Sequence, residues 1–160
     1  MFGELLGKAF QRNQWIIERQ VDGLSHDDSL VQSPYNINCL NWVLGHIANG
    51  RDDLLELLGR ERMMDEDDAA QYKRESEPIT EDGPGVLPLE ELLDILHNST
   101  SELGDVLERL TAEQLAEERD WGGNTSTVAE WCQFFYFHDT YHTGQTDLLR
   151  QVAGKNDKVI

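Results

Sequence analysis

The chain has 160 residues, of which 39% are hydrophobic, so we expect one domain with a single core over residues 1–160. Its 31 acidic and 13 basic side chains give a formal net charge of −18, which repels nucleic acid and anionic membranes. No apolar run approaches the roughly 18 residues that cross a bilayer, and the N-terminus lacks the pattern of a signal peptide. We therefore expect a cytoplasmic protein that binds neither nucleic acid nor membrane.

Four segments with the apolar spacing of amphipathic helices follow one another along the chain. They span about 2–24, 38–59, 88–110 and 127–152. The polar residue Asn13 interrupts the apolar stripe of the first segment. The last segment opens with Thr127 and Glu130, which match a capping box and so mark where this helix begins.

The connections between these segments differ in length and composition. Residues 60–88 are highly charged, contain three prolines and show little periodicity. We expect a long connection there, with one short helix near 67–74. Residues 111–126 are expected to form a loop that starts with a helical turn, and no alternating strand pattern of useful length occurs. The pattern predicts an all-α four-helix bundle with a long crossover connection between helices two and three.

Two of the five histidines, His138 and His142, lie four residues apart in "FHDTYHTGQTD". Helix positions i and i+4 share one face with Cβ atoms about 5–6 Å apart, a spacing at which two imidazoles can bind one ion. A third ligand has to come from another helix, and His46 is the candidate because Gly45 and Gly50 beside it allow close helix approach. Three histidines and a water would make an open site of the catalytic type. The alternative is that each histidine is a hydrogen-bonded core or rim residue.

The other two histidines are weaker candidates for the site. His26 lies in an acidic turn and is expected to be solvated, whereas His97 lies at the edge of an apolar stripe. "HDTYH" resembles the zincin pattern H-E-x-x-H, but Asp139 is a methylene too short and no further histidine follows. We expect Asp139 to point away from the ligands. A di-iron site would need carboxylates on all four helices and two E-x-x-H motifs, and only "DILH", residues 94–97, comes close to that motif.

Two stretches, "NWVLGHIANGRDDLLELLG" and "FHDTYHTGQTDLLRQ", resemble the DinB-like superfamily of metal-binding four-helix bundles. The resemblance covers nearly the whole chain. It rests on one histidine in helix two, the H-x-x-x-H pair in helix four and the Gly-Gln that follows. It implies that His46, His138 and His142 bind zinc, nickel or a related divalent ion, and that the protein is a homodimer. Characterised relatives include thiol-dependent transferases and isomerases that use mycothiol or bacillithiol.

Such an ion has two obvious uses, since it can lower the pKa of a bound water for hydrolysis or deprotonate a bound thiol. The resemblance favours a thiol-dependent S-transferase or isomerase whose substrate is a small electrophile. A metal-hydroxide hydrolase and a non-catalytic metal-binding stress-response dimer are the alternatives. Three imidazoles suit zinc and nickel, and also iron, cobalt and copper.

Four polar residues follow the predicted ligands at helical spacings. A side chain three or seven positions along a helix lies near the same face as the ligand, so it can orient an imidazole, hold water or position a substrate. For Asp53 and Tyr141 the alternatives are a solvated acid and a packing residue. The candidates for such roles are Asn49, Asp53, Tyr141 and Gln145.

Overall fold

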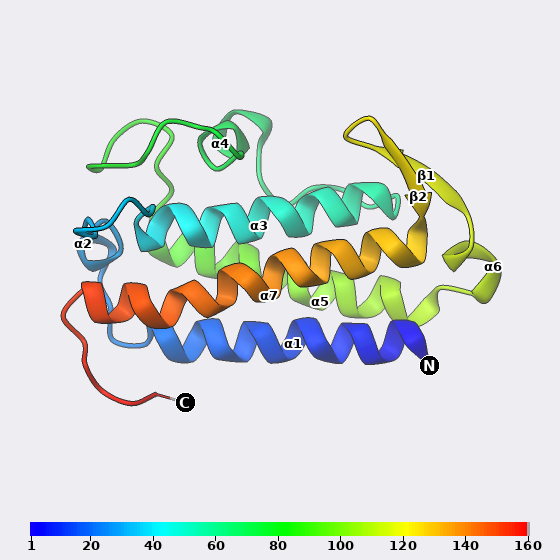
Figure 1. Ribbon diagram of the computed structural model, residues 1–160, viewed down its shortest axis with the longest axis horizontal. Coiled ribbons are helices and arrows are strands. Elements are labelled where there is room, and N and C mark those ends of the chain that lie inside the picture. The colour runs from blue at the N-terminus through cyan, green and yellow to red at the C-terminus, as the bar shows by residue number, and fades with distance from the viewer. Residues whose placement is uncertain (160) are drawn as a thin grey trace.

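The computed structural model describes residues 1–159 and is mostly helical, as the sequence predicts. Its four long helices lie side by side (Figure 1): α1 (Phe2–Val21), α3 (Leu40–Leu57), α5 (Leu89–Arg109) and α7 (Val128–Val152). The shorter elements are α2 (His26–Ser29), α4 (Glu66–Gln71), α6 (Ala112–Leu115), β1 (Glu118–Trp121) and β2 (Asn124–Thr127). Among residues 1–159, none of the helices is both long and apolar enough to cross a membrane.

The long helices pack in pairs that do not follow their order in the chain. Helix α1 packs against α5 and α7, and α3 packs against the same two helices. Figure 1 shows α3 and α5 running in one direction and α1 and α7 in the other. The segment 58–88 therefore returns along the length of the helices, and its helix α4 contacts α3.

The core consists of two apolar clusters with a polar layer between them. The first cluster includes Ile17, Leu44 and Leu92, and the second includes Phe10, Leu54, Leu103 and Phe135. Fully burying a side chain of this size stabilises a fold by about 1.5–3 kcal/mol. In each long helix, buried polar residues occupy the positions between the two clusters. They include Asn13, Gln14, Arg51, Ser99, Thr100 and Asp139.

Helix α7 begins where the sequence predicts. The Thr127 hydroxyl accepts the Glu130 N–H, and the Glu130 carboxylate accepts the Thr127 N–H at 3.0 Å, which completes the capping box. Hydrogen bonds from Ser126 and Thr127 lower the pKa of Glu130 to about 2. The carboxylate is therefore charged at neutral pH, and the cap fixes the start of the helix that carries His138 and His142.

The strict all-α prediction is wrong over residues 118–127, where β1 and β2 form an antiparallel hairpin with Glu118 opposite Thr127. The turn residues Gly122 and Gly123 both have positive φ, 56° and 79°. Two-residue hairpin turns of this kind favour glycine for that reason. Each strand has four residues and a mostly exposed, polar surface, so the sequence shows no alternation there. The hairpin places Trp121 against Phe135 of α7.

Candidate metal centre

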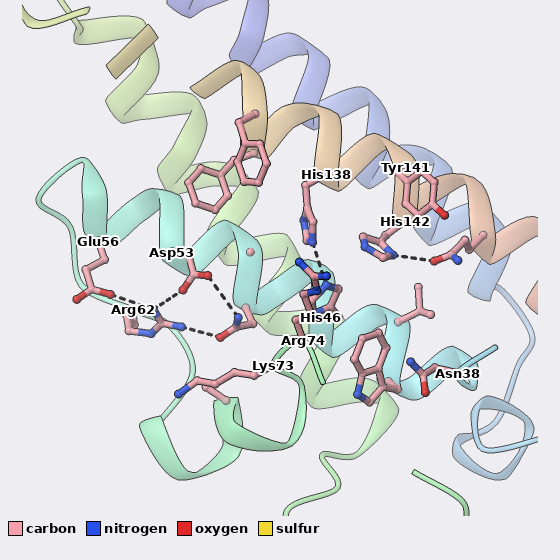
Figure 2. Close-up of a pocket in the computed structure, with 18 of the residues that line it drawn as sticks. Asn38, His46, Asp53, Glu56, Arg62, Lys73, Arg74, His138, Tyr141 and His142 are labelled. Atoms are coloured by element: carbon pink, nitrogen blue, oxygen red, sulfur yellow. Dashed lines mark hydrogen bonds and ion pairs between the residues drawn. The ribbon is translucent and has the colours of Figure 1, made fainter. Parts of the chain in front are cut away.

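Three histidines from two helices meet at one point. His46 comes from α3, and His138 and His142 come from α7 (Figure 2). One nitrogen of each ring lies within 4.8 Å of a nitrogen of the other two. The Nε2 atoms of His46 and His138 are 2.9 Å apart. Tetrahedral zinc with bonds of about 2.0–2.1 Å keeps its ligand nitrogens about 3.3 Å apart, so small shifts would adapt the cluster to an ion.

Two of the rings have a fixed tautomer. The backbone carbonyl of Tyr72 accepts a hydrogen bond from Nδ1 of His46 at 2.7 Å. Gln145 Oε1 accepts one from Nδ1 of His142, also at 2.7 Å. Because these acceptors are oxygens, the proton lies on Nδ1, and each Nε2 carries the lone pair that can bind an ion. Metal-binding histidines in proteins are usually held by such a partner on the second nitrogen.

All three histidines are held in the neutral form. Burial, followed by the nearby His142 and His46, lowers the pKa of His138 to about 3. Burial also lowers the pKa of His46 and of His142, although the Tyr72 carbonyl and the Gln145 side chain partly oppose it. Neutral imidazoles are the form that binds metal ions, so the donor set fits a divalent cation at neutral pH.

Packing around the rings depends on a glycine and a tryptophan. A Cβ atom at Gly50 would lie 2.9 Å from both Cε1 and Nδ1 of His138, too close for the ring to stay in place. Trp42 stacks on His46 with ring centroids 4.6 Å apart and an interplanar angle of 19°. Gly45 was expected to allow close approach of another helix. It instead makes room for the ring of Tyr72, which a Cβ at this position would overlap.

The three histidines open onto a cavity of about 1100 Å³. One part of its wall is aromatic, with Trp42, Trp121, Phe134, Phe135 and Tyr141. Another part is polar and charged, and Figure 2 shows Asp53, Glu56, Arg62 and Lys73 grouped on the α3 and α4 side. The cavity therefore offers apolar surface and hydrogen-bonding groups beside the histidines, which is typical of a small-molecule site.

Comparison with known proteins assigns the fold and the family. The family model of the DinB superfamily matches residues 9–146. The chain belongs to the DinB superfamily. One solved structure, the crystal structure of a conserved protein from Enterococcus faecalis, aligns over 94% of this chain and 96% of that one, with a TM-score of 0.73 and 18% identity. At that identity the likeness shows the fold alone. No curated protein matches the chain.

Four other polar residues were expected near the three histidines of this DinB-superfamily protein, and all four line the cavity. Gln145 contacts His142 directly. Asn49 and Asp53 are instead held by Arg62, which donates to Asn49 Oδ1 at 2.8 Å and to Asp53 Oδ1 at 2.7 Å. Tyr141 is 60% exposed, and its ring meets that of His142 edge to face.

Tyr72 is the main residue of the site that the sequence of this DinB-superfamily protein does not predict. It lies directly after α4 in the long connection, and its side chain is completely buried. Its hydroxyl donates to Asn41 Oδ1 at 3.1 Å and accepts the Leu87 N–H at 2.7 Å, which fixes the residue whose carbonyl holds His46. A backbone carbonyl leaves no mark in a sequence, so no motif could reveal this contact.

Residues outside the histidine cluster of this DinB-superfamily protein have other roles. Asp139 points into the interior and pairs with Arg51, as expected for a residue that is not a zincin base. The side chain of His97 is 69% exposed near Glu18, outside the cavity. His26 is not the solvated residue expected, because it is partly buried and its Nδ1 accepts the Leu89 N–H at the start of α5.

Proposed function

We propose that this DinB-superfamily protein is a metal-dependent enzyme that joins a low-molecular-weight thiol to a small electrophile. His46, His138 and His142 hold the divalent ion, with zinc and nickel as the first candidates. The observation that carries the proposal is the convergence of three neutral imidazoles, two with Nδ1 already engaged, beside a cavity of about 1100 Å³. Three protein ligands leave a coordination position for an exchangeable group.

A divalent ion in this position would lower the pKa of a thiol, so that sulfur is a nucleophile near neutral pH. The residues of the chain supply the rest. Tyr72 and Gln145 orient two imidazoles, and Trp42 packs against His46. The aromatic wall, with Trp121 and Phe134, takes the apolar part of the electrophile. In an addition, sulfur bonds to the electrophilic carbon and the thiol proton ends on the neighbouring atom of the electrophile, so no further reactant is needed.

We further propose that the four long helices form one domain, the metal-binding four-helix bundle of this superfamily, with a crossover connection between α3 and α5. We also propose that the protein is a cytoplasmic homodimer. One side of α7 supports the dimer because it exposes large apolar side chains to solvent. Phe137 is 67% exposed there, and the others are Phe134, Tyr141 and Leu148. Phe134 and Tyr141 also line the cavity, so a partner on this face would narrow its mouth. Sedimentation of the purified protein tests the dimer.

The activity is tested with zinc-loaded or nickel-loaded protein, 1-chloro-2,4-dinitrobenzene as the electrophile, and mycothiol or bacillithiol as the thiol. Sulfur replaces chloride on the ring, chloride and the thiol proton pass to the solvent, and the thioether product is followed by its absorbance. We expect metal-dependent turnover that His138→Ala abolishes. His97→Ala, which changes an exposed histidine outside the cavity, should leave turnover unchanged.

The outcomes separate the alternatives. Hydrolysis of an ester without added thiol would favour the metal-hydroxide hydrolase over the transferase. Bound metal with neither reaction, across several electrophiles and thiols, would favour a non-catalytic metal-binding protein.

A further inference from the structure

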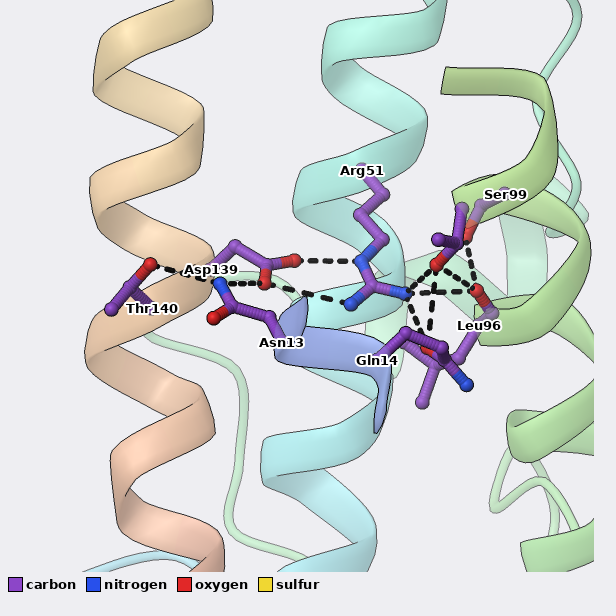
Figure 3. A network of polar contacts seen from close by, with 8 residues as sticks. Asn13, Gln14, Arg51, Leu96, Ser99, Asp139 and Thr140 are labelled. Atoms are coloured by element: carbon purple, nitrogen blue, oxygen red, sulfur yellow. Dashed lines mark hydrogen bonds and ion pairs between the residues drawn. The ribbon is translucent and has the colours of Figure 1, made fainter. Parts of the chain in front are cut away.

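A buried polar network links all four long helices (Figure 3). Its centre is Arg51 of α3, which is 1% exposed and pairs with Asp139 of α7, which is 2% exposed. Nε of Arg51 donates to Asp139 Oδ2 at 2.6 Å. Nη1 of Arg51 donates to Gln14 Oε1 of α1 at 2.8 Å and to Thr100 Oγ1 of α5 at 2.7 Å. Asn13 of α1 donates to Asp139 Oδ1 at 2.8 Å.

Like the histidine cluster, the network includes contacts between α3 and α7. These contacts lie at nearly the same position along the two helices as the histidines. Asp139 directly follows His138 in α7. Arg51 directly follows Gly50, the residue on which the ring of His138 packs. Successive helix positions point about 100° apart, so His138 faces the cavity while Asp139 faces the interior. The Arg51–Asp139 pair therefore fixes α7 against α3 within one residue of a metal ligand.

Stability alone is a poor explanation for this pair. The polar layer divides the interior into two apolar clusters, where larger apolar side chains would form one continuous core. Replacing a buried ion pair by apolar residues of similar volume is often neutral or stabilising, because both ions lose their hydration. What the pair does provide is a fixed position of α7 relative to α3. Arg51 is held by partners on three other helices, and its guanidinium is planar and rigid.

A metal site needs ligands that are held in fixed positions. Ligand distances in metal sites hold to within about 0.2 Å, so a small slide or rotation of α7 against α3 would separate His46 from His138 and His142. Asn13 of α1 donates to both Asp139 Oδ1 and Thr140 Oγ1 of α7, each at 2.8 Å, and these bonds oppose a rotation of α7. A plain apolar contact between the helices would permit more sliding than this set of directional hydrogen bonds.

We propose that Arg51 and Asp139 are positioning residues that set the α3–α7 register in which His46, His138 and His142 bind one ion. The inference rests on the proposed metal site and extends it to residues that touch neither the ion nor the cavity. Their removal should weaken metal binding even when the helices remain folded.

The test compares wild type with Asp139→Asn, which keeps the shape of the side chain and removes its charge. Thr100→Val is the milder second variant, because it removes one acceptor of Arg51 and leaves α3 and α7 unchanged. Arg150→Met is the matched control. Arg150 is also a buried arginine, on α7, but it binds the carbonyls of Gln20 and Asp22 and the Asp157 carboxylate, and none of its partners lies on α3.

Zinc affinity is measured by competition with a chromogenic chelator, and ligand geometry by the visible spectrum of bound cobalt(II), at a temperature where circular dichroism shows each variant folded. We expect Asp139→Asn to lower zinc affinity about tenfold or more and to alter the cobalt spectrum, as loss of an outer partner does. Thr100→Val should also lower zinc affinity and alter the cobalt spectrum, but less than Asp139→Asn does. Arg150→Met should lower the midpoint of urea unfolding and leave affinity and spectrum as in wild type.

Wild-type affinity and spectrum in the folded network variants would overturn the inference and leave the metal site standing. An equal loss of affinity in Arg150→Met would also overturn it, since the effect would then follow from general destabilisation. Failure of wild type itself to bind zinc or cobalt would instead contradict the proposed function, and the positioning role with it.

Discussion

Nε2 of His46 and Nε2 of His138 lie 2.9 Å apart, although 92 positions separate the two residues in the chain. The contact exists because α3 and α7 pack side by side and because Gly50 leaves room for the ring of His138. Neither ring has a charge that would keep them apart, since burial lowers the pKa of both.

Gly50→Ala should weaken zinc binding without unfolding the protein. The added methyl group would lie 2.9 Å from the ring of His138 and displace it. We expect affinity to fall about 10–100-fold, as for other disturbed ligand orientations. Gly144→Ala is the matched variant on α7, where a Cβ meets nothing within 4 Å. It should raise the free energy of unfolding by about 0.5–1 kcal/mol, because alanine favours helices over glycine, and leave affinity unchanged. Equal zinc affinities in the two variants would show that the position of the His138 ring does not depend on Gly50.

The metal-free protein should lose stability as pH falls from about 7.5 to about 5.5. Histidine in an unfolded chain titrates near 6.5, whereas burial lowers the pKa of folded His138 to about 3. Between these values the unfolded state binds a proton that the folded state does not, so falling pH favours unfolding. The contribution of one such histidine approaches about 1.4 kcal/mol per pH unit.

Urea unfolding in the presence of a chelator at both pH values measures this loss. His138→Gln should reduce the difference, because its side chain does not titrate. Burial raises the pKa of Asp52 and of Asp53, so their protonation at lower pH favours the folded state. Both residues are present in the wild type and in the variant, so their effect cancels in the comparison. The same pH dependence in variant and wild type would show that His138 is not held neutral by the fold.

Thr127→Ala should destabilise the fold by about 0.5–2 kcal/mol, the usual effect of removing a helix N-cap. The Thr127 hydroxyl satisfies the Glu130 N–H at the start of the longest helix. Thr111→Ala removes the equivalent cap from the four-residue helix α6 and should have a smaller effect. Urea midpoints compare the two variants, and an equal or larger loss in Thr111→Ala would argue against the importance of the α7 cap.

Neither cysteine should react with a thiol reagent in the native protein. Cys39 and Cys132 are both buried, and burial raises the pKa of Cys132 to about 12 and also raises that of Cys39. The thiolate is the reactive form, so the native chain should release almost no chromophore from Ellman's reagent, and both thiols should react in urea. Fast reaction of the native protein would show that one cysteine is accessible and ionised.

The sequence predicts the long helices and the His138–His142 pair because both depend on local spacing. Apolar side chains repeat every three or four residues in the helices, and His138 and His142 share a face for the same reason. The capping box at Thr127 is equally local. His46 is 92 positions away from His138, and it is predicted as the third ligand from its place beside Gly45 and Gly50 on another amphipathic segment.

The contacts that the sequence does not predict are long-range or made by the backbone. The Tyr72 carbonyl holds His46, but any residue at that position would present a carbonyl. Arg51 and Asp139 are charged types that usually lie on the surface, and only the packing of α3 on α7 shows them paired. Asn49 and Asp53 share a face with His46 as expected, yet Arg62 from the long connection binds them instead of an imidazole.

Elemental analysis of zinc-reconstituted, desalted protein tests whether His46, His138 and His142 together bind one divalent ion. Wild type and His97→Ala should each retain about one zinc ion per chain, as a three-histidine site requires. His46→Ala, His138→Ala and His142→Ala should each retain far less while remaining helical by circular dichroism. Wild type without zinc, or His46→Ala and His138→Ala with as much zinc as wild type, would contradict the proposed metal site.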